Sequence, residues 1–239
     1  MTLMRFLNAL ERRLVRWVRR FVLWVAHWRL TEDTRVLSLR LQREALWHEA
    51  GGEYRLKYDF DLSESSLVID VGGFEGYFAG ELFVRHKPRM MIFEPVSSYF
   101  NGLVNRFGRN SSFTLINKAL GGSSRQDSIY LGSGASSLSK GAETSDTFEV
   151  IDVIDVADVI REVGSVDLLA LNCEGGEYEI LRRLIDCQLQ QNIKCFFIQF
   201  HDLSPTASAD VGDIMARLKE THRVDFEFPW VWTKLSLKT

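Results

Sequence analysis

Cysteine and proline are both scarce in this sequence. Its three cysteines, Cys173, Cys187 and Cys195, form no CxxC pair and are odd in number. This pattern argues against a disulfide framework and favours a reducing compartment. We interpret the three cysteines as small apolar residues of the core. Only four prolines occur, and no Pro/Gly/Ser-rich linker separates two comparable halves. The composition therefore predicts one globular domain with an appendage.

Long apolar runs, phosphate-binding motifs and metal-ligand spacings are also missing. The longest uninterrupted apolar run near the start is 21–26, far short of the ~20 residues that span a bilayer. The arginines around that run exclude a secretory signal. No GxxxxGK[ST] pattern occurs, which excludes a Walker-type nucleotide site. The spacing of His27, His48, His86 and His222 suits no metal, so we interpret them as non-catalytic.

Charge is unevenly distributed. Residues 1–30 contain seven arginines and one acid, whereas the whole chain has a formal net charge of −3. The slightly negative total argues against a general nucleic-acid binder. On a helical wheel, the Leu, Phe and Trp residues of 1–30 fall opposite an arginine face.

Two interpretations of that amphipathic pattern remain open. An arginine face opposite a Trp/Phe/Leu face is typical of a helix lying in the plane of an anionic membrane. The same pattern also suits a helix that packs on the domain or on a second copy of the chain. We expect an N-terminal amphipathic helical extension over 1–52 in a cytoplasmic protein, with residues 1–30 binding the inner membrane face or self-associating.

From residue 67 onward, strand-like and helix-like patterns alternate. This alternation predicts an α/β fold with a mostly parallel sheet and crossover helices. We expect core strands at 67–71, 90–93, 113–116, 166–171 and 194–200, and a terminal hairpin at 223–228 and 231–237. Helices are expected at 31–50, 158–163, 178–189 and 211–220. Residues 54–60 are interpreted as an extended lead-in, and 128–131 is expected to pair with 148–153.

The first core strand ends in paired glycines, and a third glycine opens the following helix. In an open α/β sheet, ligands bind beyond the carboxyl ends of the strands. Glu94 ends the second strand, where a carboxylate can accept both hydroxyls of a ribose. The glycines run Gly-Gly-x-x-Gly, unlike the GxGxxG of pyrophosphate binding. A nucleoside without phosphates, such as S-adenosylmethionine, therefore fits better than a nicotinamide dinucleotide, and an ordinary tight turn is the alternative.

Four segments recur in order and spacing as in a known family. They are Val68 to Gly76, Phe93-Glu94-Pro95, Asn117 to Gly121 and Asp167 to Tyr178. With them the chain resembles the FkbM-type methyltransferases over about residues 54–236. The resemblance implies a Rossmann-like class I methyltransferase domain over 53–239. Its fold would be a mostly parallel seven-stranded sheet with a C-terminal antiparallel hairpin, preceded by N-terminal helices.

The family also implies an activity, namely S-adenosylmethionine-dependent O-methylation of a hydroxyl on a glycan or lipid-linked saccharide. We expect the cofactor to be bound by residues at strand ends and in the glycine turn: Asp70, Gly72, Gly73, Gly76, Glu94, Asn117, Asn172 and Glu174. His201 is the expected general base, because it ends a strand on the ligand side and histidine titrates near neutrality. Asp202 and Glu177 are reserve candidates. A divalent metal on Asp70, Glu94 and Glu174 is the weaker idea.

The sequence departs from the family at the fourth strand. Ala170 stands where the family often has Lys, and Asn172 where it often has Asp. The missing Lys keeps open a non-catalytic adaptor that binds membrane or a partner through residues 1–30. A nicotinamide-dependent reductase is the second alternative, which the glycine spacing disfavours. The Gly/Ser-rich stretch 132–141 is expected to be a surface loop or a lid.

Overall fold

The computed structural model describes residues 32–131, 136–137 and 148–238. Contacts within the chain divide it into two units, Met1–Glu53 and Tyr54–Thr239. The amphipathic segment 1–30 and nearly all of the expected lid at 132–141 lie outside the described residues.

The first unit contributes one described helix, α2 (Glu32–Glu49). Gly51 has a φ of 73°, a conformation that glycine adopts without strain and that commonly ends helices. The Trp47 side chain is 1% exposed, and its Nε1 donates to Glu53 Oε1 at 2.7 Å. The helix expected over 31–50 with a glycine stop is therefore confirmed. Of the helices in the described ranges, none combines the length and the apolar character that crossing a bilayer requires.

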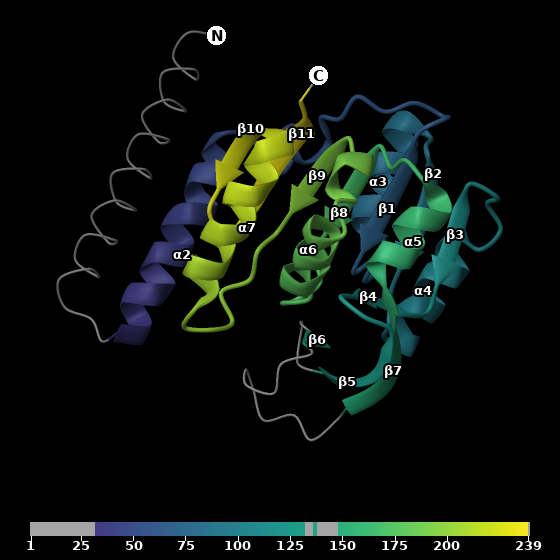
Figure 1. Ribbon diagram of the computed structural model, residues 1–239, viewed down its shortest axis with the longest axis horizontal. Coiled ribbons are helices and arrows are strands. Elements are labelled where there is room, and N and C mark those ends of the chain that lie inside the picture. Colours follow the sequence, from purple (N-terminus) through teal and green to yellow (C-terminus); the bar gives the residue numbers. More distant parts are fainter. Residues whose placement is uncertain (1–31, 132–135, 138–147, 239) are drawn as a thin grey trace, which may run out of the picture. The chain divides into compact units, whose positions relative to one another are not determined.

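The second unit is built on the expected seven-stranded sheet (Figure 1). Its strand order is β10-β11-β9-β8-β1-β2-β3, and β11 is the one strand of this sheet that runs opposite to the other six. The bounds are β1 (Leu67–Val71), β2 (Arg89–Phe93), β3 (Phe113–Ile116), β8 (Leu168–Leu171), β9 (Cys195–Ile198), β10 (His222–Phe228) and β11 (Trp232–Leu237). The prediction of a mostly parallel sheet with a C-terminal hairpin is thus confirmed.

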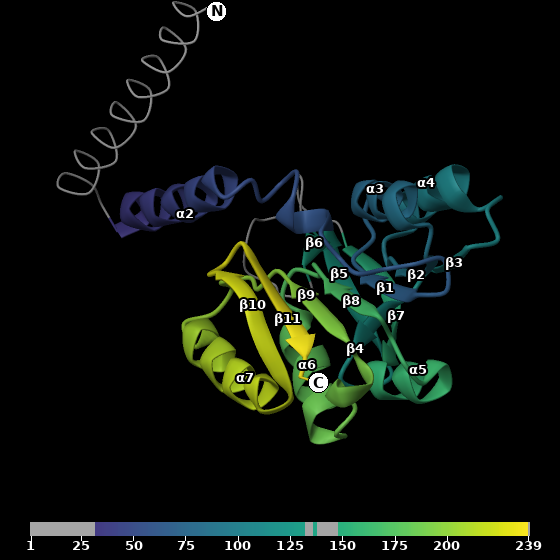
Figure 2. The same ribbon diagram turned by 90° about the horizontal axis from the view of Figure 1, so that it is seen from above.

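Helices cover both faces of this sheet. Figure 2 shows α3 (Tyr77–His86) and α4 (Ser97–Phe107) on one face. The opposite face carries α5 (Val156–Val163), α6 (Glu177–Asp186) and α7 (Ala207–Thr221). A short 3₁₀ turn, η2 (Gln190–Asn192), leads into β9.

The extended lead-in predicted for 54–60 is wrong at its centre. Leu56–Tyr58 instead forms a 3₁₀ turn, η1. The turn brings the Tyr58 ring onto Phe78, with ring centroids 5.8 Å apart, and its carbonyl to the ring of His86 at 3.2 Å. These contacts with α3 are long-range, so the local pattern of the sequence could not reveal them.

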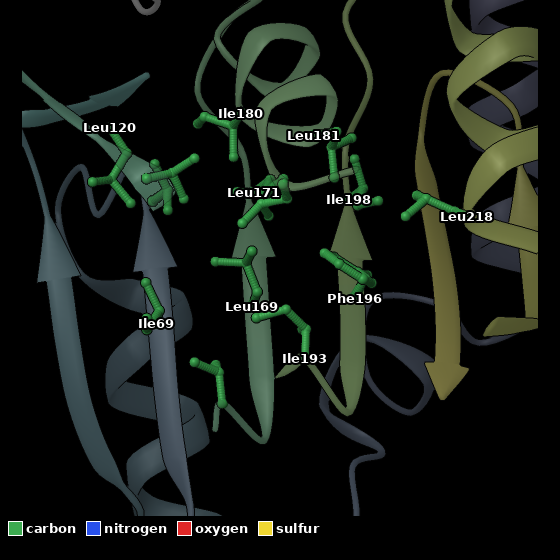
Figure 3. Close-up of a cluster of buried hydrophobic side chains, with 14 of the residues drawn as sticks. Ile69, Leu120, Leu169, Leu171, Ile180, Leu181, Ile193, Phe196, Ile198 and Leu218 are labelled. Atoms are coloured by element: carbon green, nitrogen blue, oxygen red, sulfur yellow. The ribbon is translucent and has the colours of Figure 1, made fainter. Parts of the chain in front are cut away.

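The largest core lies between the central strands and α6 (Figure 3). Ile69, Leu169 and Leu171 alternate toward this face and pack against Ile180 and Leu181 of α6. All five side chains are fully buried, and burying each contributes about 1.5–3 kcal/mol. The packing fixes the strand ends at which the chemistry is expected.

A second sheet adjoins the carboxyl ends of the first. It comprises β4 (Ala119–Gly121), β5 (Arg125–Leu131), β6 (Ser136–Ser137) and β7 (Phe148–Asp155), in the order β4-β7-β5-β6. The expected pairing of 128–131 with 148–153 is confirmed. Ile129 and Ile151 point inward and cluster with Val96 and Ala119. This apolar face becomes one wall of the candidate site.

Candidate functional site

A cavity of about 290 Å³ opens at the carboxyl ends of β1, β2 and β8. One wall is apolar and is formed largely by the second sheet and α4: Phe93, Pro95, Tyr99, Ala119, Leu120, Ile129 and Ile151. The other side follows the turns after β1 and β8: Val71, Gly72, Phe74, Asn172, Cys173, Glu174 and Gly176, with Glu94 between the two. An apolar cleft with a few convergent polar groups is the usual form of a small-molecule site.

The glycine turn after β1 uses its own amides. The backbone N–H groups of Gly72 and Gly73 both donate to the Phe93 carbonyl, at 2.9 and 3.2 Å. The Phe74 amide donates to Glu94 Oε2 at 2.8 Å. These three amides are therefore not directed at a phosphate, which is what a pyrophosphate cradle requires.

Two of the three glycines of the turn serve packing. A Cβ on Gly73 would lie 2.3 Å from Ile92 Cγ2, and one on Gly76 would lie 2.6 Å from the Phe107 ring. Gly76 also has a φ of 77°, which favours glycine. Neither residue lines the cavity. Gly72 does line it and, at a φ of 87°, approaches the Asn172 carbonyl so closely that a Cβ would lie 2.1 Å from that oxygen.

Two buried acids lie at the carboxyl ends of β1 and β2, and one of them, Glu94, lines the cavity. Asp70 and Glu94 are each 4% exposed. Burial first, and the charge of Glu94 second, raise the pKa of Asp70 to about 7. Burial also raises the pKa of Glu94, against the opposing effect of the amides of Val96 and Phe74, which donate to its two oxygens. Such sites favour a ligand that brings positive charge or hydroxyl donors.

Asn117 supports the site from behind. Its Nδ2 donates to the backbone carbonyls of Glu94 at 2.9 Å and Pro95 at 3.0 Å. It does not line the cavity. Its amide instead fixes the turn that follows β2 and so holds the Glu94 carboxylate in place.

His201 lies between two carboxylates. Its Nδ1 is 3.1 Å from Glu177 Oε1, and its Nε2 is 3.4 Å from Glu174 Oε1. Burial alone would lower the pKa of His201, but the hydrogen bonds and charges of Glu174 and Glu177 outweigh it and raise the pKa to about 9. At neutral pH the ring is therefore an imidazolium, with both nitrogens acting as donors.

The comparison with known families settles the kind of protein. The family profile described as "Methyltransferase FkbM domain" matches residues 70–228, which is more than half of the chain. The chain belongs to the FkbM methyltransferase family. The FkbM domain spans the sheet from β1 to β10, so it includes the glycine turn, both buried acids and the His201 cluster. The protein is accordingly an S-adenosylmethionine-dependent methyltransferase with the Rossmann-like class I fold.

Solved structures similar to this FkbM methyltransferase are distant in sequence. A putative rRNA methylase from Clostridium thermocellum matches with 9% identity and a TM-score of 0.47, covering 74% of this chain and 89% of its own. An rRNA methylase from Streptococcus thermophilus matches with 9% identity and a TM-score of 0.45, covering 74% and 90%. TrmK of M. capricolum, solved with S-adenosyl-homocysteine, matches with 11% identity and a TM-score of 0.38, covering 75% and 65%. No curated protein sequence matches the chain.

The FkbM site gathers only part of the predicted residue set. Gly72, Glu94, Asn172 and Glu174 line the cavity, whereas Asp70 is buried within β1 and does not line it. Gly73, Gly76 and Asn117 support the turns around it, as described above. His201 contacts the cavity through Glu174, and Asp202 is exposed beside it. Whether each residue binds the cofactor or takes part in catalysis stays a prediction.

Sequence reasoning missed the apolar wall and underrated Glu177. The wall forms only when the second sheet packs against the ends of the main strands. The alternation of apolar residues around Ile129 and Ile151 predicts two strands but not where they pack. Glu177 looked like an ordinary acid in the first turn of α6. In the structure its side chain is fully buried and accepts from the backbone amides of Gly175 and His201, each at 2.8 Å.

Proposed function

We propose that this FkbM methyltransferase uses S-adenosylmethionine to methylate a hydroxyl of a saccharide. The observation that carries the cofactor part is the pair of buried acids, Asp70 and Glu94, next to a glycine turn. The amides of Gly72, Gly73 and Phe74 in that turn donate to protein oxygens and not to a phosphate. When bound, S-adenosylmethionine would supply an electrophilic methyl group on a sulfonium.

The buried acids fit this donor. Among the described residues, neither a hydrogen-bond donor nor a cation accompanies the Asp70 carboxylate, whose raised pKa reflects burial and Glu94. A ligand ammonium would supply the missing charge. Each Glu94 oxygen accepts one amide and retains a second lone pair for a hydroxyl of a ribose. The wall that includes Tyr99 and Ile151 suits a planar base.

The acceptor side of the cavity is polar and acidic. Asn172 and Glu174 line it, and Asp202 is exposed nearby. Carboxylates and amides accept hydrogen bonds from hydroxyl groups, whereas a cluster of acids repels a polyanion such as RNA. These groups support a neutral saccharide hydroxyl as acceptor.

We also propose that the acceptor is met at a membrane. The arginine and Trp/Phe/Leu pattern of residues 1–30 supports binding to the anionic inner face of the cytoplasmic membrane. Saccharides carried on lipids are assembled at such surfaces, so a lipid-linked saccharide would be within reach. Self-association through the same residues is the competing outcome.

Titration calorimetry tests the proposed cofactor. We expect S-adenosylmethionine and S-adenosylhomocysteine to bind and NADH not to bind. Glu94→Gln should weaken binding about tenfold or more, because a hydrogen bond to a charged group contributes ~1.5–3 kcal/mol. Glu162→Gln, an exposed change on α5, is the matched control and should leave affinity unchanged. Binding of neither sulfur ligand would refute the methyltransferase activity and leave the adaptor; binding of NADH alone would indicate a reductase.

A further inference from the structure

His201 is fixed at three points by the start of α6. Its backbone N–H donates to Glu177 Oε1 at 2.8 Å, and its backbone carbonyl accepts from the Tyr178 hydroxyl at 2.8 Å. Its ring Nδ1 lies 3.1 Å from the same Glu177 oxygen. Glu177 also accepts from the Gly175 amide through Oε2. One buried carboxylate thus joins the turns that follow β8 and β9.

The remaining ring nitrogen is directed at Glu174. His201 Nε2 is 3.4 Å from Glu174 Oε1, and Glu174 lines the cavity with its side chain 32% exposed. Glu174 lies in a tight turn closed by the Gly176 amide and the Cys173 carbonyl, with a φ of 50°. A non-glycine residue in that region is strained, and such strain concentrates at functional sites.

The other titratable groups of the cavity are poor proton acceptors. Glu94 lies in the cofactor part of the cavity and already accepts two backbone amides. The Cys173 thiol has its pKa raised well above the ordinary value, first by burial and then by Glu177. His201 is protonated at neutral pH by virtue of Glu174 and Glu177. Among the described residues that line the cavity, Glu174 is therefore the best candidate for the proton acceptor.

We propose that Glu174 is the catalytic base of the methyl transfer, and that Glu177 and His201 are positioning residues that hold its carboxylate toward the acceptor hydroxyl. The inference rests on the proposed function. The acceptor oxygen forms a bond to the methyl carbon as the carbon–sulfur bond breaks and its electron pair passes to sulfur. The hydroxyl proton moves to the Glu174 carboxylate and then to water, which reaches this partly exposed side chain.

An NMR titration of the histidine ring protons tests the positioning without any acceptor. We expect one ring, assigned to His201 by its loss in His201→Gln, to titrate near pH 9 in the full chain. Glu177→Gln should lower that pKa by at least one unit, and Glu162→Gln should not change it. A wild-type His201 titrating near its ordinary value would overturn the proposal even where Glu177→Gln fails to fold.

The dependence of rate on pH tests the base. The assay follows transfer of labelled methyl from S-adenosylmethionine to the saccharide fraction of the cells that make the protein. We expect kcat to fall as pH rises through about 9, since the imidazolium that positions Glu174 is then lost. If His201 itself were the base, kcat would rise through the same range. Such a rise would overturn the proposal.

Glu174→Gln separates catalysis from cofactor binding. Loss of a general base typically costs about 10²–10⁴-fold, so we expect kcat to fall in that range. The sequence predicts that Glu174 binds the cofactor, whereas a base faces the acceptor; the affinity for S-adenosylmethionine by calorimetry should therefore stay unchanged. Retained kcat would overturn the role of Glu174. Wild-type protein that binds no sulfur ligand would instead refute the proposed function, an outcome that the NMR titration distinguishes because it needs no ligand.

Discussion

Asp70 is a buried acid whose pKa lies near neutrality. In the sheet its register partners are Ala170 on β8 and Ile92 on β2, and neither brings a cation. Burial and Glu94 therefore raise the pKa of Asp70 to about 7. A cationic ligand binds better to the ionised form, so its binding is linked to loss of this proton.

We predict that affinity for S-adenosylmethionine weakens about tenfold per pH unit below pH 7 in the wild type. Ala170→Lys would place an ammonium beside Asp70 and should lower its pKa by roughly 1–3 units. The affinity of this variant should then vary less with pH between 5.5 and 7.5 than that of the wild type. Calorimetry over that range measures both, and Ala170→Met controls for the added length. A wild-type affinity that does not vary with pH would contradict the linkage.

Residues that end strands could be predicted from the sequence, but residues that act across the fold could not. Glu94 and Asn172 follow apolar runs, so their place at the sheet edge follows from strand periodicity alone. Glu177 acts on His201, 24 positions away, and only the juxtaposition of two turns reveals the pair. The raised pKa of His201 depends on the same juxtaposition, so a base near neutrality was the natural expectation from sequence.

The turn between β1 and α3 depends on close packing at Gly73. A methyl group there would meet Ile92 Cγ2 at 2.3 Å, and that side chain is buried and β-branched. We expect Gly73→Ala to lower the free energy of unfolding by about 1–3 kcal/mol, the usual effect of overpacking. Gly102→Ala is the matched control, because no atom lies within 4 Å of its added methyl on the exposed face of α4. It should stabilise by roughly 0.5–1 kcal/mol. Urea unfolding of both variants decides the matter, and equal stability would contradict the packing role.

Asp155 joins β7, α5 and α6. Its side chain accepts from the Ala157 amide at 2.8 Å as the N-cap of α5 and pairs with Arg183 of α6 at 2.6 Å. Burial would raise the pKa of Asp155, but Arg183 and the Ala157 amide outweigh it and lower the pKa. Its stabilisation is therefore present above the unfolded value of ~3.9 and lost as pH falls through the lower folded value.

Asp155→Ala should cost about 0.5–2 kcal/mol at pH 7 from the lost cap, with a further loss from the ion pair. Asp155→Asn keeps a capping oxygen and should cost less. Urea unfolding at pH 7 gives both values, and the difference between wild type and Asp155→Asn should shrink as pH drops below 4. A difference that persists in acid would contradict the charge-based explanation.

At the level of elements, the main sheet was predictable because its five adjacent parallel strands each carry a short apolar run and the β10–β11 hairpin alternates apolar and polar residues. Only part of the second sheet could be predicted from the sequence. Its β5–β7 pair shows alternation, but β4 (Ala119–Gly121) is three residues long and lies within a motif that looks like a loop. What attaches this sheet to the site is a set of long-range contacts, such as Glu149 accepting from the Ser97 amide at 3.1 Å at the start of α4. Such contacts leave no local periodicity.

Positive charge is concentrated at the start of the chain, and the remainder is acidic. Seven arginines and one acid fall within residues 1–30, while the net charge of the full chain is −3. An acidic remainder would be repelled by an anionic surface, so attachment must come from the first thirty residues. A binding experiment on the full chain tests this attachment.

We predict that the full chain pellets with vesicles containing anionic lipid and much less with neutral ones. Replacing Arg12, Arg13, Arg16, Arg19 and Arg20 by Gln should abolish the difference, since each arginine near such a surface contributes roughly 1 kcal/mol. The same five positions changed to Lys keep the charge and should keep the binding. Because the attraction is screened within ~10 Å at 0.1 M salt, added salt should release the wild type. Equal pelleting of the Gln and Lys variants would refute the membrane interpretation, and a dimer of the wild type in solution would then favour self-association.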